Sequence, residues 1–140
     1  GTWAPFNSQN TAFARDLVPA YFLFPFVGRY DDIWAGYIIR VLSDYFGDAV
    51  TYGAPLVFQK RNEHDYFKDF DDERLGMKFN DIFINAITSC KLETESYAGG
   101  FEQIMHQLPA QIRLAIKNVE DLKHFDGLVK GAKIWSAIFE

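Results

Sequence analysis

Apolar residues recur in pairs at every fourth position between residues 33 and 46, and this spacing limits the possible folds more than any other feature. An α-helix has 3.6 residues per turn, so such pairs form one broad apolar face. Gly47 follows the last pair, and glycine commonly ends a helix. The sequence therefore predicts a helix that packs against a hydrophobic core. The paired residues are Ile33, Trp34, Tyr37, Ile38, Val41, Leu42, Tyr45 and Phe46.

Helical spacing returns in the second half of the chain. One helix is predicted from Glu73 to Cys90, with Asp71 or Asp72 as its cap, and another over residues 97–108. Pro109 suits the first turn of a helix, so a further helix is predicted over residues 109–122. A final helix is predicted over residues 128–139.

Two other stretches favour extended structure. Residues 49–60, "AVTYGAPLVFQK", are rich in Val, Thr, Tyr and Phe around a Gly-Ala-Pro turn, which predicts two short strands. Residues 6–13 predict a short strand or an extended segment before a brief helical stretch from Asp16. The charged, aperiodic residues 61–76 predict a surface loop. The expected fold class is α+β: one helix-rich domain over residues 1–140 with a small sheet.

Composition excludes several classes of protein. The 140 residues carry a net charge of −5, with scattered basic residues, so nucleic acid is not an expected partner. The longest apolar run, residues 17–27, is too short to span a membrane. With a single cysteine, Cys90, and no signal-peptide pattern, a reducing, cytoplasmic location is expected. The aromatic share of 17% favours rings that line a groove or a partner surface.

Two adjacent carboxylates open the first predicted helix, in "GRYDDIWAGYII". Asp31 can act as an N-cap and Asp32 as a favourable first-turn charge. Alternatively, Asp32 points into a cleft, where it acts as a general base or accepts hydroxyl groups of a ligand. Trp34 then offers a flat face for a sugar, and Arg29 either holds a carboxylate or phosphate or pairs with Asp31.

The stretch "GRYDDIWAGYIIRVLSDYFGDAVTYGAPLVF" resembles the plant reversibly glycosylated polypeptides, also called UDP-arabinopyranose mutases. Their pattern is close to G-R-Y-D-D-M-W-A-G-W, followed by a helix, a glycine and a G-L-P turn. "NSQNTAFARDLVPAYFLFP" and "DGLVKGAKIWSAIFE" are similar to flanking parts of the same family. The likeness concerns the carboxy-terminal half of these proteins, and a similar organisation occurs in the plant Golgi group called STELLO.

The resemblance implies the acceptor-side half of a glycosyltransferase-like fold of the GT-A type. In such enzymes the amino-terminal half binds the nucleotide, and its D-x-D motif holds a divalent metal, Mn²⁺ or Mg²⁺. The acidic run "DFDD" at residues 69–72 is on the wrong side of the chain order and is interpreted as surface charge. The chain is thus expected to be a fragment or truncated form. Alone it would hold no metal and be inactive, and its partner would be a nucleotide-binding half or a second copy.

Transferred to this sequence, the family pattern implies a site for a nucleotide sugar or carbohydrate around the acid pair. Gly36 would let backbones approach. Gln59 stands where the family has a histidine, and glutamine is a poor metal ligand. His64, five residues further on, either replaces the missing imidazole or is a solvated loop histidine, and the second interpretation is favoured. His106 and His124 have no partner at ligand spacing and are interpreted as structural. The implied catalytic residues are Asp32 and Asp31, and the implied substrate-binding residues are Arg29, Trp34, Asn7, Asn10 and Arg61.

Three hypotheses remain open from the sequence. The first is the carbohydrate-handling half of a sugar-nucleotide-dependent glycosyltransferase or mutase. The second is a non-catalytic module on the same scaffold that binds a carbohydrate or a protein. The third is a helical scaffold whose role is unrelated to either.

Overall fold

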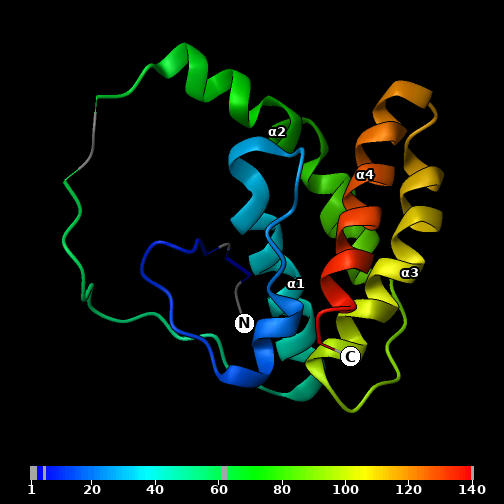
Figure 1. The fold of residues 1–140 in the computed structure, drawn as a ribbon, viewed down its shortest axis with the longest axis horizontal. Helices are drawn as coiled ribbons and strands as arrows, with labels where there is room; N and C mark the ends of the chain where they lie inside the picture. The colour runs from blue at the N-terminus through cyan, green and yellow to red at the C-terminus, as the bar shows by residue number, and fades with distance from the viewer. Residues whose placement is uncertain (1–2, 5, 61–62, 140) are drawn as a thin grey trace.

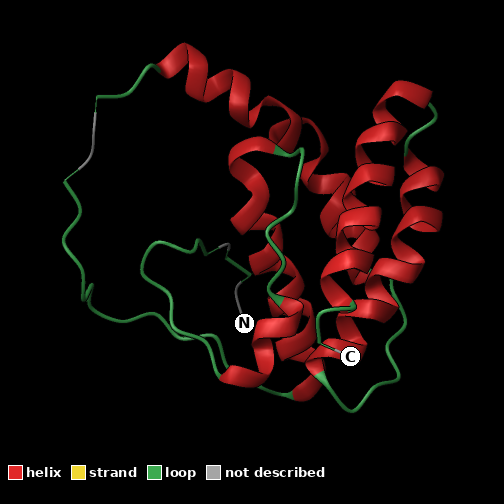
Figure 2. Ribbon diagram, in the orientation of Figure 1, coloured by secondary structure: helices red, strands yellow, loops and turns green. Residues whose placement is uncertain are grey.

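The computed structural model describes residues 3–4, 6–60 and 63–139, and these residues form helices joined by loops (Figure 2). Two short 3-10 helices, η1 (Arg15–Ala20) and η2 (Gly28–Tyr30), precede four α-helices. The α-helices are α1 (Asp31–Phe46), α2 (Tyr66–Thr88), α3 (Tyr97–Ala115) and α4 (Val119–Ser136). No helix of the described residues is long and apolar enough to cross a membrane.

Helix α1 lies at the centre of the core, as its apolar spacing predicts. Its residues 34–39 are all buried, and α2, α3 and η1 pack around it. Gly47 ends the helix in the left-handed conformation, with φ of 77°, and its N–H donates to the carbonyl of Ser43. Helices α3 and α4 lie side by side on the other side of the core (Figure 1). The core thus holds the start of α1, where the acid pair lies, in a fixed position.

The expected small sheet is wrong, because the described residues contain no strand. Residues 49–60 are extended but make no backbone hydrogen bond with another described residue, and they leave the helical body as a long arc (Figure 1). Residues 6–13 form turns and coil against α1, not a strand. A β-prone sequence becomes a strand only when a second strand pairs with it. The α+β class is therefore corrected to all-helical for the residues described.

Three helix boundaries also differ from the predictions. Helix α2 begins at Tyr66 and not near Glu73, because Asp65 caps it by accepting hydrogen bonds from two backbone N–H groups. Pro109 lies inside α3, where Leu108 and Ile112 are both fully buried on the same face. The break between helices comes instead at residues 116–118, and α4 then runs without interruption from Val119 to Ser136, so the predicted separation of a helix over 109–122 from one over 128–139 is wrong. The brief helical stretch predicted from Asp16 is present as η1.

Candidate functional site

The acid pair forms the first turn of α1, directly after η2. Tyr30 occupies the N-cap position and makes no side-chain capping bond, so the interpretation of Asp31 as the N-cap is wrong. Asp31 is the first helical residue, and its Oδ1 accepts a hydrogen bond of 2.8 Å from the backbone N–H of Asp32. Both carboxylates also lie at the positive end of the helix dipole, which favours their charge.

Asp32 binds the amino-terminal segment to α1. Its Oδ2 accepts hydrogen bonds from the backbone N–H and from the hydroxyl of Ser8, both at 2.9 Å. One turn further along α1, a Cβ on Gly36 would lie 2.8 Å from the carbonyl oxygen of Phe6. The expectation that Gly36 permits a close backbone approach is thus confirmed, and these two contacts hold residues 6–8 against the helix.

The two asparagines belong to this same segment, but they have different surroundings. The side-chain oxygen of Asn7 accepts a hydrogen bond of 3.1 Å from the backbone N–H of Gln9, so it shapes a turn. Asn10 lines a cavity between the amino-terminal segment and residues 48–56. Both therefore lie in the segment that Asp32 holds, and their predicted contact with a ligand stays a prediction.

Tyr21 is a member of the site that the sequence did not indicate. Its ring packs on Phe13, with 4.3 Å between ring centroids, and its buried hydroxyl has no hydrogen-bond partner among the residues described. Burial, and then the charges of Asp32 and Asp31, raise the pKa of Tyr21 to about 12. The phenol therefore keeps its proton beside the acid pair at neutral pH. The sequence did not indicate its role, because Tyr21 lies in the irregular segment after η1, where no helical or strand spacing marks a buried residue.

Trp34 lies in the core and not at the surface. Its exposed fraction is 0%, and its ring stacks on Phe83 with 4.1 Å between centroids and 7° between planes. Phe125 also stacks on it, at 6.0 Å. The predicted flat face for a sugar is therefore covered by other rings. Trp34 anchors the first turn of α1 in the core.

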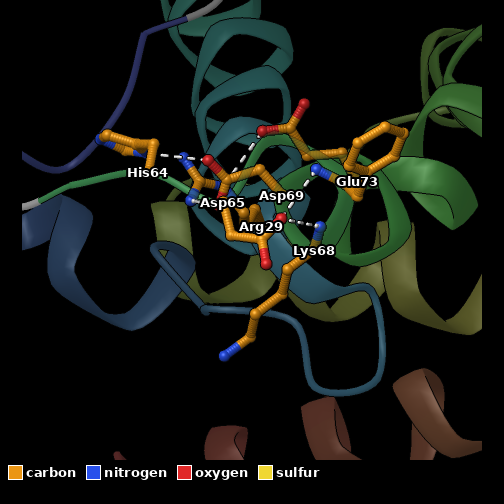
Figure 3. Close-up of polar contacts among 7 residues, drawn as sticks. Arg29, His64, Asp65, Lys68, Asp69 and Glu73 are labelled. Carbon is orange, nitrogen blue, oxygen red and sulfur yellow. Dashed lines mark hydrogen bonds and ion pairs between the residues drawn. The ribbon is translucent and has the colours of Figure 1, made fainter.

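Arg29 points toward the first turns of α2, as Figure 3 shows. Its guanidinium pairs with Asp69 at 2.8 Å and with Glu73 at 3.0 Å, and not with Asp31. His64 Nδ1 lies 2.7 Å from the other oxygen of Asp69. The hydrogen bond from His64, and then the charge of Arg29, hold the pKa of the Asp69 carboxyl below its usual value. Arg29 thus ties η2 to α2 beside the acid pair.

The remaining expectations from the sequence concern Arg61, a metal site and two histidines. Arg61 lies outside the described residues. Within the part of the chain that the structure describes, no group of three or more His, Cys, Asp or Glu side chains is arranged to hold a metal ion. His106 and His124 are exposed, on α3 and α4 respectively.

Comparison with known proteins identifies the family. UDP-arabinopyranose mutase 1 of Arabidopsis thaliana is 27% identical over 96% of this chain, and UDP-arabinopyranose mutase 3 of the same plant is 27% identical over the whole chain. UDP-arabinopyranose mutase 1 of Oryza sativa subsp. japonica is 28% identical over 91% of this chain. The matches cover only 38–39% of these relatives, in their carboxy-terminal part. Residues 1–139 match the family described as reversibly glycosylated polypeptide, and the chain therefore belongs to this family.

Proposed function

We propose that this chain forms the carbohydrate-handling part of a sugar-nucleotide mutase or a related glycosyltransferase. Family membership over residues 1–139 supports the proposal, as do relatives whose names state a UDP-linked sugar as their substrate. Because the chain spans 38% of the length of the first of these relatives, the nucleotide is proposed to bind a part of the protein outside this chain. On its own the chain is expected to be inactive.

The acid pair is the observation that carries this proposal. The hydrogen bonds among the described residues engage one oxygen of each carboxylate, and neither Asp31 nor Asp32 forms an ion pair with a described residue. Both residues are only partly buried, so the second oxygen of each carboxylate can stay available without a cationic partner. Arg29, the nearest candidate in sequence, is engaged by Asp69 and Glu73 instead. The pair is therefore left as an acceptor for hydroxyl groups.

Asp32 is proposed as the residue that acts on the sugar. A hydroxyl group of the sugar or acceptor would donate its hydrogen bond to this carboxylate. As the hydroxyl oxygen forms its bond to the anomeric carbon, the bond from that carbon to the diphosphate breaks and Asp32 takes the proton. Ser8 would fix the orientation of Asp32, and Asp31 would raise the negative potential at the same place.

The charge of the departing diphosphate requires a cation near it. Arg29 is one proposed contact of the diphosphate, and to make it Arg29 would give up its ion pairs with Asp69 and Glu73. Arg61 is a second proposed contact. A divalent metal, Mn²⁺ or Mg²⁺, is proposed for the complete protein with ligands outside the described residues. One residue supports that placement: Gln59 stands where the family has a histidine, and glutamine is a poor metal ligand.

A non-catalytic binding module is the second candidate, because one observation favours it. Large apolar side chains are exposed along the arc and the first turn of α2: Phe58 is 94% exposed, Leu56 90% and Phe67 87%. Exposed apolar surface of this kind commonly forms an interface with a partner protein. The partner would be the nucleotide-binding part of the protein or a second copy of this chain.

The decisive experiment measures sugar transfer by the longest natural form of the protein, with Asp32→Asn as the variant. Asp32→Asn should depress turnover far more than it lowers the unfolding free energy. Asp31→Asn is the matched comparison, and Asn118→Ala at the start of α4 is a control that loses stability far from the site. If the Asp32→Asn protein turns over at the wild-type rate, Asp32 is not the catalytic base, and the binding-module candidate replaces the enzymatic one.

Calorimetric titration with UDP-sugars, with and without Mn²⁺, tests whether the nucleotide binds to this chain or to a part of the protein outside it. The long form should bind and this chain alone should not. Binding of equal strength by both would contradict the proposal that the nucleotide is held outside this chain.

A further inference from the structure

A cavity of about 690 Å³ lies between the amino-terminal segment, the end of α1 and residues 48–56. This volume is within the range of small-molecule sites. The acid pair is not among its lining residues, although Asn10 is. We propose that the cavity binds a neutral sugar, and this proposal rests on the carbohydrate-handling function proposed above.

A row of three hydrogen-bonding side chains lies in the wall of the cavity. Ser43 is only 2% exposed, and its Oγ lies 3.5 Å from the hydroxyl of Tyr97. That hydroxyl donates to Oδ2 of Asp48 at 2.7 Å, so its oxygen accepts from Ser43. Burial and then the Asp48 carboxylate raise the pKa of Tyr97, which keeps its proton. The row therefore holds one oxygen of Asp48, an exposed residue, at the wall of the cavity.

Asp48 keeps capacity to bind a ligand. Its Oδ1 accepts no hydrogen bond that the structure records among the described residues, and the side chain lines the cavity. A carboxylate oxygen held in place can accept two hydroxyl groups, as adjacent hydroxyls of a sugar offer. The amide of Asn10, which lines the cavity from the amino-terminal segment, can add a donor and an acceptor.

Aromatic rings supply the other half of a sugar site. Phe6, Phe13, Tyr52 and Tyr97 all line the cavity. The C–H face of a pyranose packs on such rings, while its hydroxyl groups bond at the edge. Rings together with a fixed carboxylate thus match the two chemical sides of a sugar.

The charge of the lining disfavours the nucleotide half of a nucleotide sugar. Asp48 is the only charged side chain among the described lining residues, and these include no Lys, Arg or His. A diphosphate would meet a carboxylate here and no cation, which disfavours its binding. The cavity is therefore a place for a neutral sugar bound apart from Asp32, and not for the UDP group.

The test is an NMR titration of the ¹⁵N-labelled chain with a methyl pentopyranoside, and separately with UDP. A single sugar buries few atoms, so a dissociation constant in the millimolar range is expected. The sugar should shift the amide signals of residues 6–14 and 48–56, and UDP should not. No shift of these signals by the sugar, or equal shifts by UDP, would overturn the proposal.

Variants of the polar row sharpen the test. Asp48→Asn keeps the shape but removes the charge, and it should weaken sugar binding about tenfold. Tyr97→Phe removes the group that positions Asp48 and should weaken binding less. Asp81→Asn, on the exposed face of α2, is the matched control and should bind like the wild type. Unchanged binding by Asp48→Asn would refute the assigned role of Asp48.

The two proposals fail in different ways. If the sugar leaves the cavity signals unchanged while Asp32→Asn still abolishes turnover by the long form, only the cavity assignment is wrong. If the sugar binds the cavity but Asp32→Asn has full turnover, the cavity assignment stands and the catalytic role of Asp32 is wrong.

Discussion

Gly76 gives the sharpest test of how α2 is held against the residues before the acid pair. It lies in the interior of α2, where alanine would ordinarily raise helix stability by about 1 kcal/mol. Here, however, a Cβ would lie 2.0 Å from Cγ and 2.5 Å from Cβ of Tyr30. These atoms are at the root of the tyrosine side chain, so rotation of the ring cannot relieve the overlap, and η2 must separate from α2.

The magnitude follows from these two opposing effects. Overpacking a tight contact costs about 1–3 kcal/mol, and contact at the root of the side chain places this case at the upper end. After the gain in helix propensity is subtracted, Gly76→Ala should lower the unfolding free energy by about 2 kcal/mol. Urea unfolding followed by circular dichroism measures the difference as a lower midpoint with an unchanged slope.

A second glycine is the matched control. Gly127 lies inside α4, and a Cβ there would lie 3.2 Å from the ring of Phe26, a side chain that is 71% exposed and free to move. Gly127→Ala should therefore raise stability by about 0.5–1 kcal/mol. If Gly76→Ala stabilises the chain as Gly127→Ala does, the packing of η2 on α2 is not as described, and neither is the placement of Arg29.

Three further outcomes are expected. Folding raises the pKa of Tyr21 from 10.0 to about 12, so the stability that the protonated Tyr21 contributes is complete below pH 10 and is lost as the pH rises toward 12. In urea unfolding, the stability of Tyr21→Phe should therefore fall less over that pH range than the stability of the wild type. Burial raises the pKa of Cys90 to about 11 from 9.0, so at pH 8 the folded thiol should react with iodoacetamide about a hundredfold more slowly than in urea. Asn118 accepts hydrogen bonds from two backbone N–H groups at the start of α4, so Asn118→Ala should cost about 1 kcal/mol in the same assay.

Elements with a complete apolar stripe could be predicted from the sequence. The stripe of α1 identified both the helix and its burial, and Gly47 fixed its end. Helix α2 was predicted too short because its first two turns carry an exposed mixture of charges and rings, such as Tyr66 and Phe67, with no apolar face to detect. Pro109 shows the opposite error: its local preference for a helix start is overridden because Leu108 and Ile112 are buried on one face of a continuous helix.

The wrongly predicted strands and the contacts that the sequence did not indicate have a common cause: both depend on partners that a local pattern does not contain. Residues 49–60 have the composition of strands, but pairing requires a neighbour. The sequence indicated the acid pair, but not its hydrogen bonds with Ser8 or its effect on the pKa of Tyr21, because both come from a segment without helical or strand periodicity. The aromatic face predicted for Trp34 went wrong because a buried tryptophan and an exposed one have the same local pattern.

The amino-terminal segment connects the two proposed parts of the site. Asp32 fixes Ser8, and Gly36 admits the backbone of Phe6, so residues 6–8 cannot move without breaking contacts with the first turns of α1. The same segment continues through Asn10 into the wall of the cavity. A carboxylate with a purely local role would hold its own helix, as Asp31 does. Asp32 instead holds a wall that a ligand in the cavity would touch, and through this long-range contact it positions the sugar that the cavity is proposed to bind.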